Sequence, residues 1–395
     1  MVVRIMGLLL VPTSLRRITL TNLLSFGPEP VTLELGNLNI LIGPNGSGKS
    51  NLIEAISLLR STPVSGRNSK RDVEGVVQRG GGISEWIWKG ALGEAASIEA
   101  VVSGSGETAL LGHFLSFREK AQRFSAEDER IYQESQQSDV PPREVYSRNS
   151  EPRKSSFAPV HTTASILAEV REPELYPEYG QLSNFYEGVR IYREWIFGRN
   201  SKLREGQRAD DRSDRLEEDF SNLGLTLSRL RNSPKVKASI LSALKDLYEG
   251  FDDFEVSIVA GFVQVNFHEG EFSIPASRLS DGTLRYLCLL AILCDPDPPP
   301  LICIEEPELG LHPDILPNLA DLLVEASKRT QLIVTTHSNI LVDAMTERPE
   351  AVIVCEKHNG RTSLSRLERA DLTMWLDKYR LGQLWMRGQL GGTRW

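Results

Sequence analysis

Short and almost continuously apolar runs recur near both ends of the chain, at 38–42, 301–304 and 332–334. Runs of this length without alternating polar residues are typical of strands that are buried on both faces of a parallel sheet. Helix-like segments follow the first run at 50–56 and precede the second at 284–293. Parallel strands need long crossovers, so this order of strands and helices predicts an α/β fold.

The middle of the chain follows other patterns. Residues 83–116 combine short apolar alternation with glycine, which predicts antiparallel strands. Residues 116–156 are polar and charged and are expected to form an exposed arm or insertion. In 236–251 apolar residues recur at steps of three and four, which predicts a packed helix, with a partner-binding helix as the alternative. Further on, 351–355 predicts a last strand and 372–385 a helix.

One glycine-rich segment carries most of the chemical information. Residues 43–50 read Gly-Pro-Asn-Gly-Ser-Gly-Lys-Ser and match the pattern G-x-x-x-x-G-K-[ST] without a mismatch. The segment lies between a predicted strand and a predicted helix, where backbone N–H groups and the helix N-terminus can surround a triphosphate. Lys49 is expected against the β- and γ-phosphates, and the Ser50 hydroxyl on Mg²⁺. The residues expected to contact ATP are Gly43, Pro44, Asn45, Gly46, Ser47, Gly48, Lys49, Ser50 and Asn51.

Carboxylates follow the apolar run at 301–304. Glu305 and Glu306 come at the expected carboxyl end of this strand, where ligands bind in open α/β sheets. We expect Glu305 to hold Mg²⁺, directly or through water, and Glu306 to polarise the attacking water. The run at 332–334 leads in the same way to His337, which could donate a hydrogen bond to the γ-phosphate. An acidic surface turn and a structural histidine are the plainer alternatives.

The segment 278–283 opens the helix-like run at 284–293. Ser280 and Asp281 are good helix-capping residues, and an ordinary cap is one interpretation. A helix N-terminus with a free hydroxyl and a nearby glycine, here Ser280 and Gly282, can also receive a phosphate. Both interpretations stay open at this stage.

The composition of the chain limits the classes of protein to which it can belong. A hydrophobic fraction of 40% is ordinary for a globular protein, and the net charge of −8 argues against a uniformly basic coat for nucleic acid. The four cysteines lack metal-binding spacing and indicate reduced thiols in a cytoplasmic protein. The apolar run 5–11 is too short to span a membrane and lacks a cleavage site, so we expect neither a signal peptide nor a membrane partner.

A local basic excess leaves a role in DNA binding open. Residues 190–237 contain twelve Lys or Arg against eight Asp or Glu. A DNA-facing patch is one interpretation, and a solvated helix face of mixed charge is the other. The candidate residues are Arg199, Lys202, Arg204, Arg208, Arg212 and Arg215.

Together these segments resemble the ABC-type ATPase heads of the RecF/SMC family, and most closely the stand-alone RecF-like AAA-type ATPases of bacteria. The resemblance identifies 43–50 as Walker A, 279–283 as the signature, 301–308 as Walker B, 308–313 as the D-loop and 335–338 as the switch-histidine segment. It implies a P-loop NTPase, an ABC-type head with an antiparallel β-subdomain and a helical lobe. Arg79 also resembles part of the arginine loop that follows Walker A in SMC-type heads, which implies a contact with the nucleotide; a cap of a strand or helix is the plainer alternative.

The resemblance further implies a homodimer that holds two ATP molecules between its subunits. Ser280 of one subunit would then contact the γ-phosphate bound by the other, since an isologous dimer satisfies this arrangement. Two positions depart from the commoner patterns: the signature reads Leu-Ser-Asp-Gly-Thr, and the first Walker B carboxylate is Glu305 instead of Asp. No Q-loop glutamine can be assigned.

On this basis we expect five parts. They are an N-terminal extension (1–14), ATPase lobe I with Walker A (15–115), a polar insertion (116–156), a helical lobe (157–270) and the signature, Walker B, D-loop and switch-histidine part (271–395). The expected function is Mg²⁺-dependent ATP hydrolysis coupled to DNA repair or to defence against foreign DNA. The alternative is a nucleotide-gated scaffold or regulator of a separate effector protein, either a nuclease or a toxin. A transporter ATPase is disfavoured by the signature.

Overall fold

The computed structural model describes residues 13–65, 70–91, 93–104, 110–135, 140–148, 162–169, 176–198, 201–205, 207–248 and 250–392. The chain forms two compact units, and each is assembled from separated segments. The first contains the described residues of Met1–Gly36, Asn45–Val189 and Cys355–Ser365, and the second contains those of Asn37–Pro44, Arg190–Val354 and Arg366–Trp395. Nearly all of the expected N-terminal extension, 1–14, lies outside the described residues.

The first unit is built on a six-stranded antiparallel sheet in the order β2-β1-β4-β5-β6-β7. Buried and less buried residues alternate along its strands, because successive side chains point to opposite faces. The strands are β1 (Leu15–Thr21), β2 (Val31–Glu34), β4 (Ala96–Ser103), β5 (Leu110–Lys120), β6 (Arg123–Glu134) and β7 (Arg143–Ser147). Its helices are α1 (Lys49–Ser61), α2 (Val73–Arg79), α3 (Ile83–Trp86) and α4 (Pro177–Gly188).

The segment expected as a polar insertion, 116–156, contains regular structure. It contributes the end of β5 and all of β6 and β7, which extend the antiparallel sheet. Most of the charged residues of β6 occupy the more exposed positions, while Phe124 and Ile131 are buried; Glu129 is the exception, a buried carboxylate. The five part boundaries themselves stay a prediction.

The second unit holds the predicted parallel strands. They belong to a six-stranded sheet of the order β16-β15-β3-β14-β13-β8, which consists of β3 (Leu38–Ile42), β8 (Arg190–Tyr192), β13 (Leu301–Glu305), β14 (Gln331–Thr335), β15 (Val352–His358) and β16 (Arg361–Arg366). The end of β15 and all but the last residue of β16 are assigned to the first unit. The strands β8, β13, β14, β3 and β15 run parallel. Strands β3 and β14 are buried along their whole length, as their apolar sequences predict.

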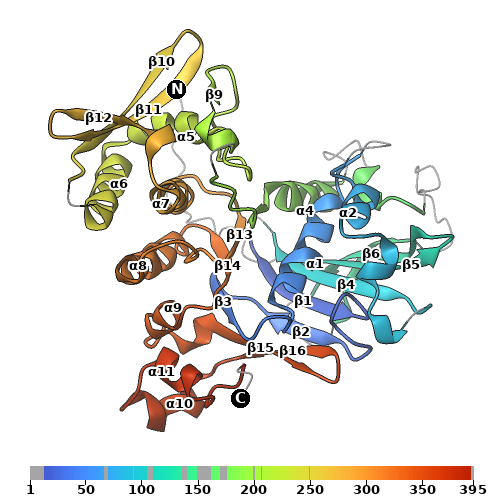
Figure 1. Ribbon diagram of the computed structural model, residues 1–395. Coiled ribbons are helices and arrows are strands. Elements are labelled where there is room, and N and C mark those ends of the chain that lie inside the picture. The colour runs from blue at the N-terminus through green and yellow to red at the C-terminus, as the bar shows by residue number, and fades with distance from the viewer. Residues whose placement is uncertain are drawn as a thin grey trace, which may run out of the picture. The chain divides into compact units, whose positions relative to one another are not determined.

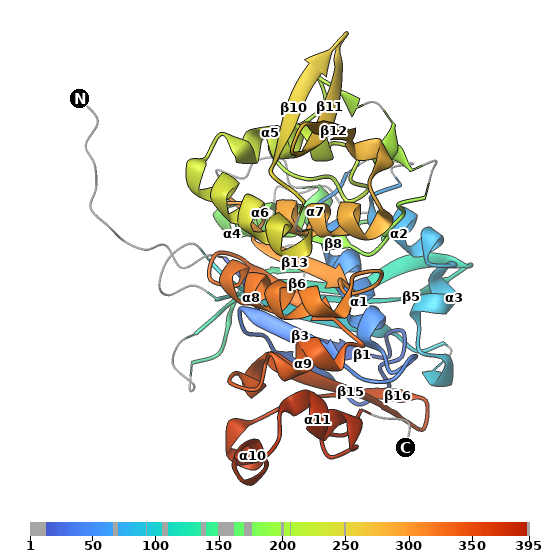
Figure 2. The same cartoon turned by 60° about the vertical axis from the view of Figure 1, so that its left-hand side comes forward.

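Helices cover this sheet within the second unit. Figures 1 and 2 show α8 (Leu316–Ala326) and α9 (Asn339–Asp343) on one face of strands β3, β14 and β13. Helix α8 buries Leu316, Leu319 and Leu323 at steps of three and four, which is the period of an amphipathic helix. Two C-terminal helices, α10 (Arg369–Leu376) and α11 (Leu381–Met386), replace the single helix expected at 372–385.

A smaller sheet and three helices complete the second unit. Strands β10 (Asp253–Val259), β11 (Phe262–Glu269) and β12 (Phe272–Pro275) form an antiparallel sheet, and β9 (Gln207–Arg208) pairs with β11. It packs with α5 (Leu223–Arg231), α6 (Pro234–Leu247) and α7 (Asp281–Leu293) into one apolar core (Figure 1). The predicted stripe in α6 buries Ile240 and Leu244, so it serves packing.

The parallel register has one consequence for function. Ile304 pairs with Val334, and Val334 with Ile40, so β13, β14 and β3 end at the same edge of the sheet. The segments that follow these strands begin with Gly43, Glu306 and Thr336. Ligands of open α/β sheets bind at this carboxyl edge.

Candidate functional site

The Walker A segment forms the loop between β3 and α1. Gly43, Gly46 and Gly48 have φ angles of 147°, 78° and 108°, which glycine adopts much more readily than other residues. Among the described residues, apart from Gly46 and its two chain neighbours, no atom lies within 4 Å of the place that a Gly46 Cβ would occupy. Ser47 Oγ is buried and has no hydrogen-bond partner among the described residues, and Lys49 is buried as well. An orphaned hydroxyl beside an open loop of this conformation suits a phosphate chain.

A hydroxyl cluster in the first unit supports this loop. Thr362 Oγ1 lies 2.8 Å from the Ser47 carbonyl oxygen and 2.7 Å from Ser25 Oγ, and Asn51 Nδ2 donates to Ser25 Oγ at 2.7 Å. A Cβ on Gly48 would come within 2.3 Å of Thr362 Oγ1, so only glycine fits there. Asn51 is one of the residues expected to contact ATP, and its side-chain amide is thus engaged in supporting the loop.

In the second unit, the expected carboxylates lie at the end of β13. Glu305 is its last residue, and Arg193, the residue after β8, places Nε 3.5 Å from Glu305 Oε1. Trp195 Nε1 donates to the Glu305 carbonyl oxygen at 2.7 Å. Glu306 follows with φ of 46°, and its N–H donates to the Thr335 carbonyl oxygen at 3.0 Å. The adjacent parallel strand therefore holds Glu306 in a left-handed conformation.

The switch histidine meets Glu306 at this edge. His337 Nε2 lies 3.6 Å from Glu306 Oε1, and both side chains are about one-third exposed. Glu308 fixes the backbone of the histidine segment, since its Oε1 accepts from Thr336 Oγ1 and from the His337 N–H, both at 2.7 Å. Glu308 Oε2 is buried and has no hydrogen-bond partner among the described residues. The structure thus places Glu305, Glu306 and His337 at one edge of the sheet, and Glu308 lies beside them.

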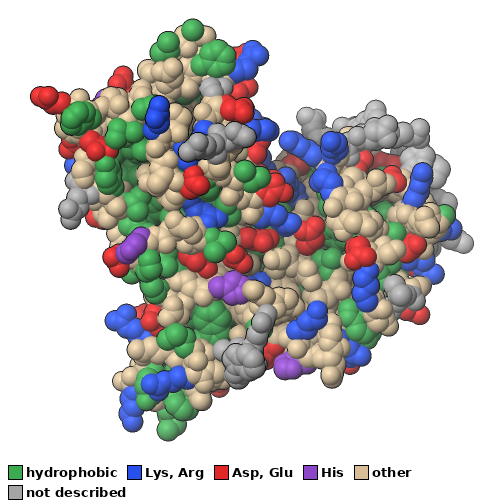
Figure 3. All heavy atoms as spheres, viewed as in Figure 1, with side chains coloured by type: hydrophobic (Ala, Val, Ile, Leu, Met, Phe, Trp, Pro, Cys, Tyr) green, Lys and Arg blue, Asp and Glu red, His purple; other side chains and the backbone are tan. Residues whose placement is uncertain are grey.

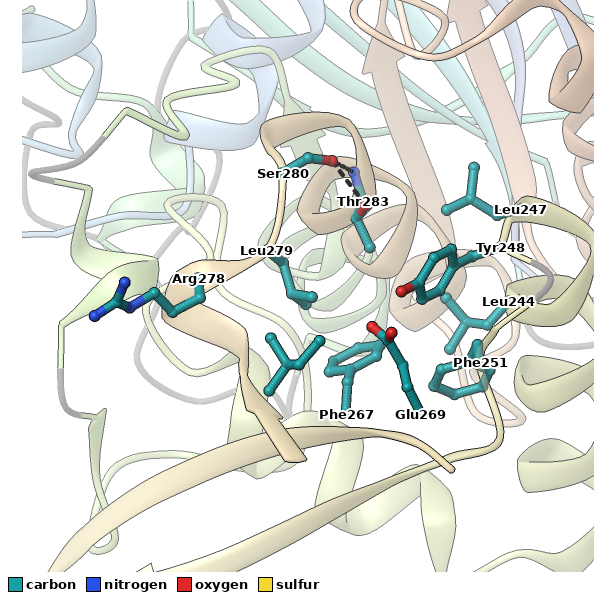
Figure 4. A pocket seen from close by; sticks show the side chains of 11 residues that line it. Leu244, Leu247, Tyr248, Phe251, Phe267, Glu269, Arg278, Leu279, Ser280 and Thr283 are labelled. Atoms are coloured by element: carbon teal, nitrogen blue, oxygen red, sulfur yellow. Dashed lines mark hydrogen bonds between the residues drawn. The ribbon is translucent and has the colours of Figure 1, made fainter. Parts of the chain in front are cut away.

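The signature segment caps α7. Ser280 Oγ accepts from the Thr283 N–H at 3.0 Å and lies 2.7 Å from Thr283 Oγ1, as the dashed lines in Figure 4 show. The capping interpretation is therefore correct, and Ser280 is also exposed at the N-terminus of a 13-residue helix. Asp281 forms an ion pair with Arg204, which offsets its charge. Beside the signature lies a cavity of about 220 Å³ whose walls include Leu244, Phe267 and Leu279 (Figure 4).

Arg285 connects α7 with the D-loop. Its guanidinium lies 4.5 Å from the centre of the Trp195 ring and donates to the Leu309 carbonyl oxygen. Burial lowers the pKa of Arg285 to about 10, although the charges of Glu308 and Glu306 oppose this shift. One turn earlier in α7, a Cβ on Gly282 would come within 2.7 Å of the Gly310 carbonyl oxygen. The signature and the D-loop therefore touch within one chain.

The site residues expected from the sequence are divided between the two units. Arg79 is exposed at the end of α2, in the first unit with Asn45, Lys49 and Ser50. The carboxylates, His337, Ser280 and Gly282 belong to the second unit. The described residues contain no cluster of three or more His, Cys, Asp or Glu that could hold a metal ion. Mg²⁺ does not need such a cluster, because it commonly takes one or two protein carboxylates and adds phosphate oxygens and water.

The basic residues considered for DNA contact are engaged locally. Lys202 pairs with Asp219, Arg208 with Asp210, and Arg212 and Arg215 both pair with Asp214; Arg199 lies outside the described residues. Arg204 donates to the Ser277 and Leu279 carbonyl oxygens and so supports the signature. On the face shown in Figure 3, basic and acidic side chains lie interspersed. The solvated face of mixed charge accounts for these contacts.

Sequence reasoning missed four of these residues: Arg193, Trp195, Arg285 and Thr362. Arg193 and Trp195 follow a short edge strand that no apolar run announces. Arg285 lies within an apolar helix, where a lone arginine was the available signal. Thr362 follows the Asn359–Gly360 turn, and this dipeptide is the signal in the sequence that indicates a hairpin there.

Residues 38–343, most of the chain, match the protein family described as "AAA domain, putative AbiEii toxin, Type IV TA system". The chain belongs to this family. Two solved SMC head domains share the fold of this AAA-domain protein at 13% sequence identity. The SMC head bound to the C-terminal winged-helix domain of ScpA has a TM-score of 0.57, and the match covers 91% of this chain and 99% of that chain.

The second structure is the SMC head with an extended coiled coil, bound to the C-terminal domain of ScpA from Pyrococcus furiosus. Its TM-score is 0.56, and the match covers 93% of this chain and 99% of that chain. No curated protein matches the sequence. The family and these structures confirm the predicted fold, a P-loop NTPase built as an SMC/RecF-like ABC-type ATPase head.

Proposed function

We propose that this ATPase of the AAA/SMC-like type hydrolyses ATP in an Mg²⁺-dependent reaction and binds it between two heads of a homodimer. One observation carries the proposal: Glu306 Oε1 and His337 Nε2 lie 3.6 Å apart at the carboxyl edge of the parallel sheet. This edge also bears the Walker A loop, which continues β3. A carboxylate beside an imidazole at such an edge suits a water-activating pair.

The proposed roles follow from the chemistry of each side chain. Lys49 and the loop N–H groups bind the β- and γ-phosphates, with Ser47 as a further donor. Ser50 and Glu305 hold Mg²⁺, which would neutralise phosphate charge when bound. Glu306 orients the attacking water, and His337 donates to the γ-phosphate. Arg79 is proposed to reach the nucleotide from α2.

The dimer is proposed from the exposed signature. Ser280 and Gly282 open a long helix whose N-terminus carries a partial positive charge, so it attracts a phosphate. Within one chain, this segment contacts the D-loop, which leads directly from Glu306. A γ-phosphate bound by the partner would therefore be sensed next to the proposed water-activating carboxylate.

For the biological role we propose defence against foreign DNA or DNA repair. The family description names a putative toxin of a toxin–antitoxin system, which supports defence. A direct contact with DNA has less support, because the described basic candidates are paired with carboxylates or, for Arg204, also hold the signature.

A second candidate function, the nucleotide-gated control of a separate effector protein, is favoured by the small sheet of the second unit. Phe272 and Ile258 are 74% and 64% exposed, and Val259 and Phe262 are about half exposed. Exposed apolar residues that cluster on one element are typical of protein-binding surfaces. The small sheet therefore offers a surface for an effector protein.

The location proposed for this ATPase is the cytoplasm. Cys288, Cys294, Cys303 and Cys355 are free thiols, which suits a reducing compartment. None of the helices in the described part of the chain has the length and apolarity needed to cross a bilayer.

The test is steady-state ATP turnover with and without linear duplex DNA, for the native protein and for Arg208→Glu with Arg212→Glu. These two arginines are exposed and away from the signature, unlike Arg204. DNA-stimulated turnover that the double variant loses would support direct coupling to DNA. Turnover that does not change when DNA is added would exclude direct coupling to DNA and would favour the control of a separate effector protein. Absence of turnover under all conditions would contradict the proposed hydrolysis.

A further inference from the structure

The first unit contains a cavity of about 360 Å³ that none of the roles above uses. It lies between the turn that joins β1 to β2 and the hairpin of β15 and β16, and its walls include Gly27, Glu29, Arg361 and Thr362. Its volume falls in the range of about 300–1,000 Å³ that is usual for small-molecule sites. The Asn359–Gly360 turn, with φ angles of 51° and 78°, shapes one wall.

The cavity adjoins the Walker A loop. Thr362 lines the cavity, and its hydroxyl also lies 2.8 Å from the Ser47 carbonyl oxygen. The strand that leads to this wall, β15, runs parallel to β3, with Val354 paired with Ile42. The hairpin turn therefore lies beyond the same carboxyl edge as the phosphate loop. A ligand whose phosphates occupy the loop can extend its remaining part into the cavity.

Arg361 is held in place at the wall of this cavity. Its guanidinium lies 5.3 Å from the centre of the Trp88 ring and 3.4 Å from Glu29 Oε1. A Cβ on Gly27 would come within 2.9 Å of Arg361 Cδ, so glycine leaves the space through which the arginine passes. The side chain is still 44% exposed. A planar cation is thus positioned by contacts on several sides and remains accessible.

We propose that this cavity receives the purine base of the bound nucleotide, with the base stacked on the Arg361 guanidinium. This inference rests on the proposed function, since the phosphates must occupy the Walker A loop. A guanidinium plane stacks well on an aromatic base, and the Glu29 carboxylate can accept hydrogen bonds from exocyclic amino groups. Arg361 is then a specificity-determining residue that recognises the nucleoside and not the phosphates.

The test compares ADP with inorganic pyrophosphate, because pyrophosphate has the phosphates without the nucleoside and neither ligand is a substrate of the proposed hydrolysis. Binding to the full chain is measured by calorimetry with Mg²⁺ for native protein, Arg361→Ala and Arg361→Lys. Stacking on a base contributes enough that we expect Arg361→Ala to bind ADP about tenfold more weakly. Pyrophosphate affinity should change less than about twofold, and lysine, which lacks the planar face, should not restore ADP binding.

The matched control is Arg130→Ala. Arg130 also lies over a ring, 4.4 Å from the centre of Phe114, and pairs with Asp128, but it lies on β6 and does not line the cavity. It should change neither affinity. Unchanged ADP binding by Arg361→Ala, an equal loss for both ligands, or full rescue by Arg361→Lys would each overturn the inference. Lys49→Ala should weaken both ligands; if it weakens neither, the proposed phosphate site fails instead.

Discussion

At the scale of single residues, Glu306 and Glu308 differ in conformation and in the contacts that they make at the carboxyl edge of the parallel sheet. Glu306 has φ of 46°, which costs a non-glycine residue about 1–2 kcal/mol and is found mostly where function requires it. The bond from its N–H to the Thr335 carbonyl oxygen maintains this conformation. Glu308 accepts from the neighbouring segment and places His337 opposite Glu306. One carboxylate is thus available for chemistry, and the other positions its partner.

Glu308→Ala tests the positioning role. Without the acceptor, the Thr336 hydroxyl and the His337 N–H lose their partner, and hydrogen bonds to a charged group are worth about 1.5–3 kcal/mol each. We expect ATP turnover to fall at least tenfold while ATP affinity changes little. Glu308→Gln keeps a carbonyl oxygen and should restore most of the turnover. Equal turnover in both variants and the native protein would show that Glu308 does not position His337.

At the scale of elements, α7 and the D-loop form one coupled assembly. Gly282 approaches the Gly310 carbonyl oxygen, and Arg285 joins the Trp195 ring to the Leu309 carbonyl oxygen. Trp195 in turn donates to the backbone of Glu305. A continuous series of packed groups therefore connects the exposed signature with the backbone of Glu305. Arg285 Nε has no hydrogen-bond partner among the described residues, so this link is retained at some expense in stability.

Arg285→Met separates coupling from stability. Methionine has a similar length and removes a buried charge whose Nε has no hydrogen-bond partner among the described residues. We expect the melting temperature to stay within a few degrees of native or to rise, while turnover falls about tenfold. Calorimetric melting and steady-state turnover measure the two quantities. Strong destabilisation, or native turnover, would contradict a coupling role.

The antiparallel sheet of the first unit contains a buried charged cluster. Glu129 is fully buried between His113, Arg148 and Ser165, with His113 Nε2 at 3.1 Å and Arg148 at 2.8 Å. Burial alone would raise the pKa of Glu129, but the hydrogen bonds from His113 and Ser165 and the charge of Arg148 hold it below its usual value. The folded state therefore favours the ionised carboxylate.

This cluster makes stability depend on pH. A lowered folded-state pKa contributes stability above the unfolded value near 4.5, and this contribution is lost as pH falls through the folded pKa. We expect Glu129→Gln to reduce the free energy of unfolding at pH 7 by about 3–5 kcal/mol, because it removes the negative charge that faces the buried Arg148 guanidinium. Urea unfolding at several pH values measures this. The variant should lose part of the acid dependence, and an unchanged pH profile would contradict the role of Glu129.

Much of the second unit's sheet could be predicted because its strands carry local signals. The runs at β3, β13 and β14 are apolar and end in motifs, so Glu305, Glu306 and His337 could be placed at one edge. Residues whose role depends on distant partners gave no such signal. Thr362 supports a loop more than 300 positions away in sequence, and Arg193 meets Glu305 across neighbouring strands. The strands β6 and β7 were obscured by their charged, exposed positions.

At the scale of the whole molecule, the proposal requires two chains per pair of nucleotides. A chain of 44.1 kDa should double its mass in ATP when hydrolysis is blocked by Glu306→Gln. Adding Ser280→Arg should keep this variant monomeric, because a long side chain at the exposed start of α7 fills the space that the partner's bound phosphate needs. Light scattering after size exclusion measures the mass.

Ser273→Arg is the matched control, since Ser273 is exposed on β12 and outside the signature. Combined with Glu306→Gln, it should still dimerise. A monomer in ATP for Glu306→Gln alone would contradict the shared site, and a Ser280→Arg dimer would show that the signature is not at the interface.

The central claim is that Glu306 activates water for hydrolysis of ATP bound at the Walker A loop. Its most direct test is ATP turnover by the native protein and by Glu306→Gln, with ATP binding measured in parallel at the same Mg²⁺ concentration. We expect similar affinity and a fall in turnover of about 100-fold or more, which is the usual contribution of a general base. Native turnover in Glu306→Gln, with ATP binding intact, would contradict it.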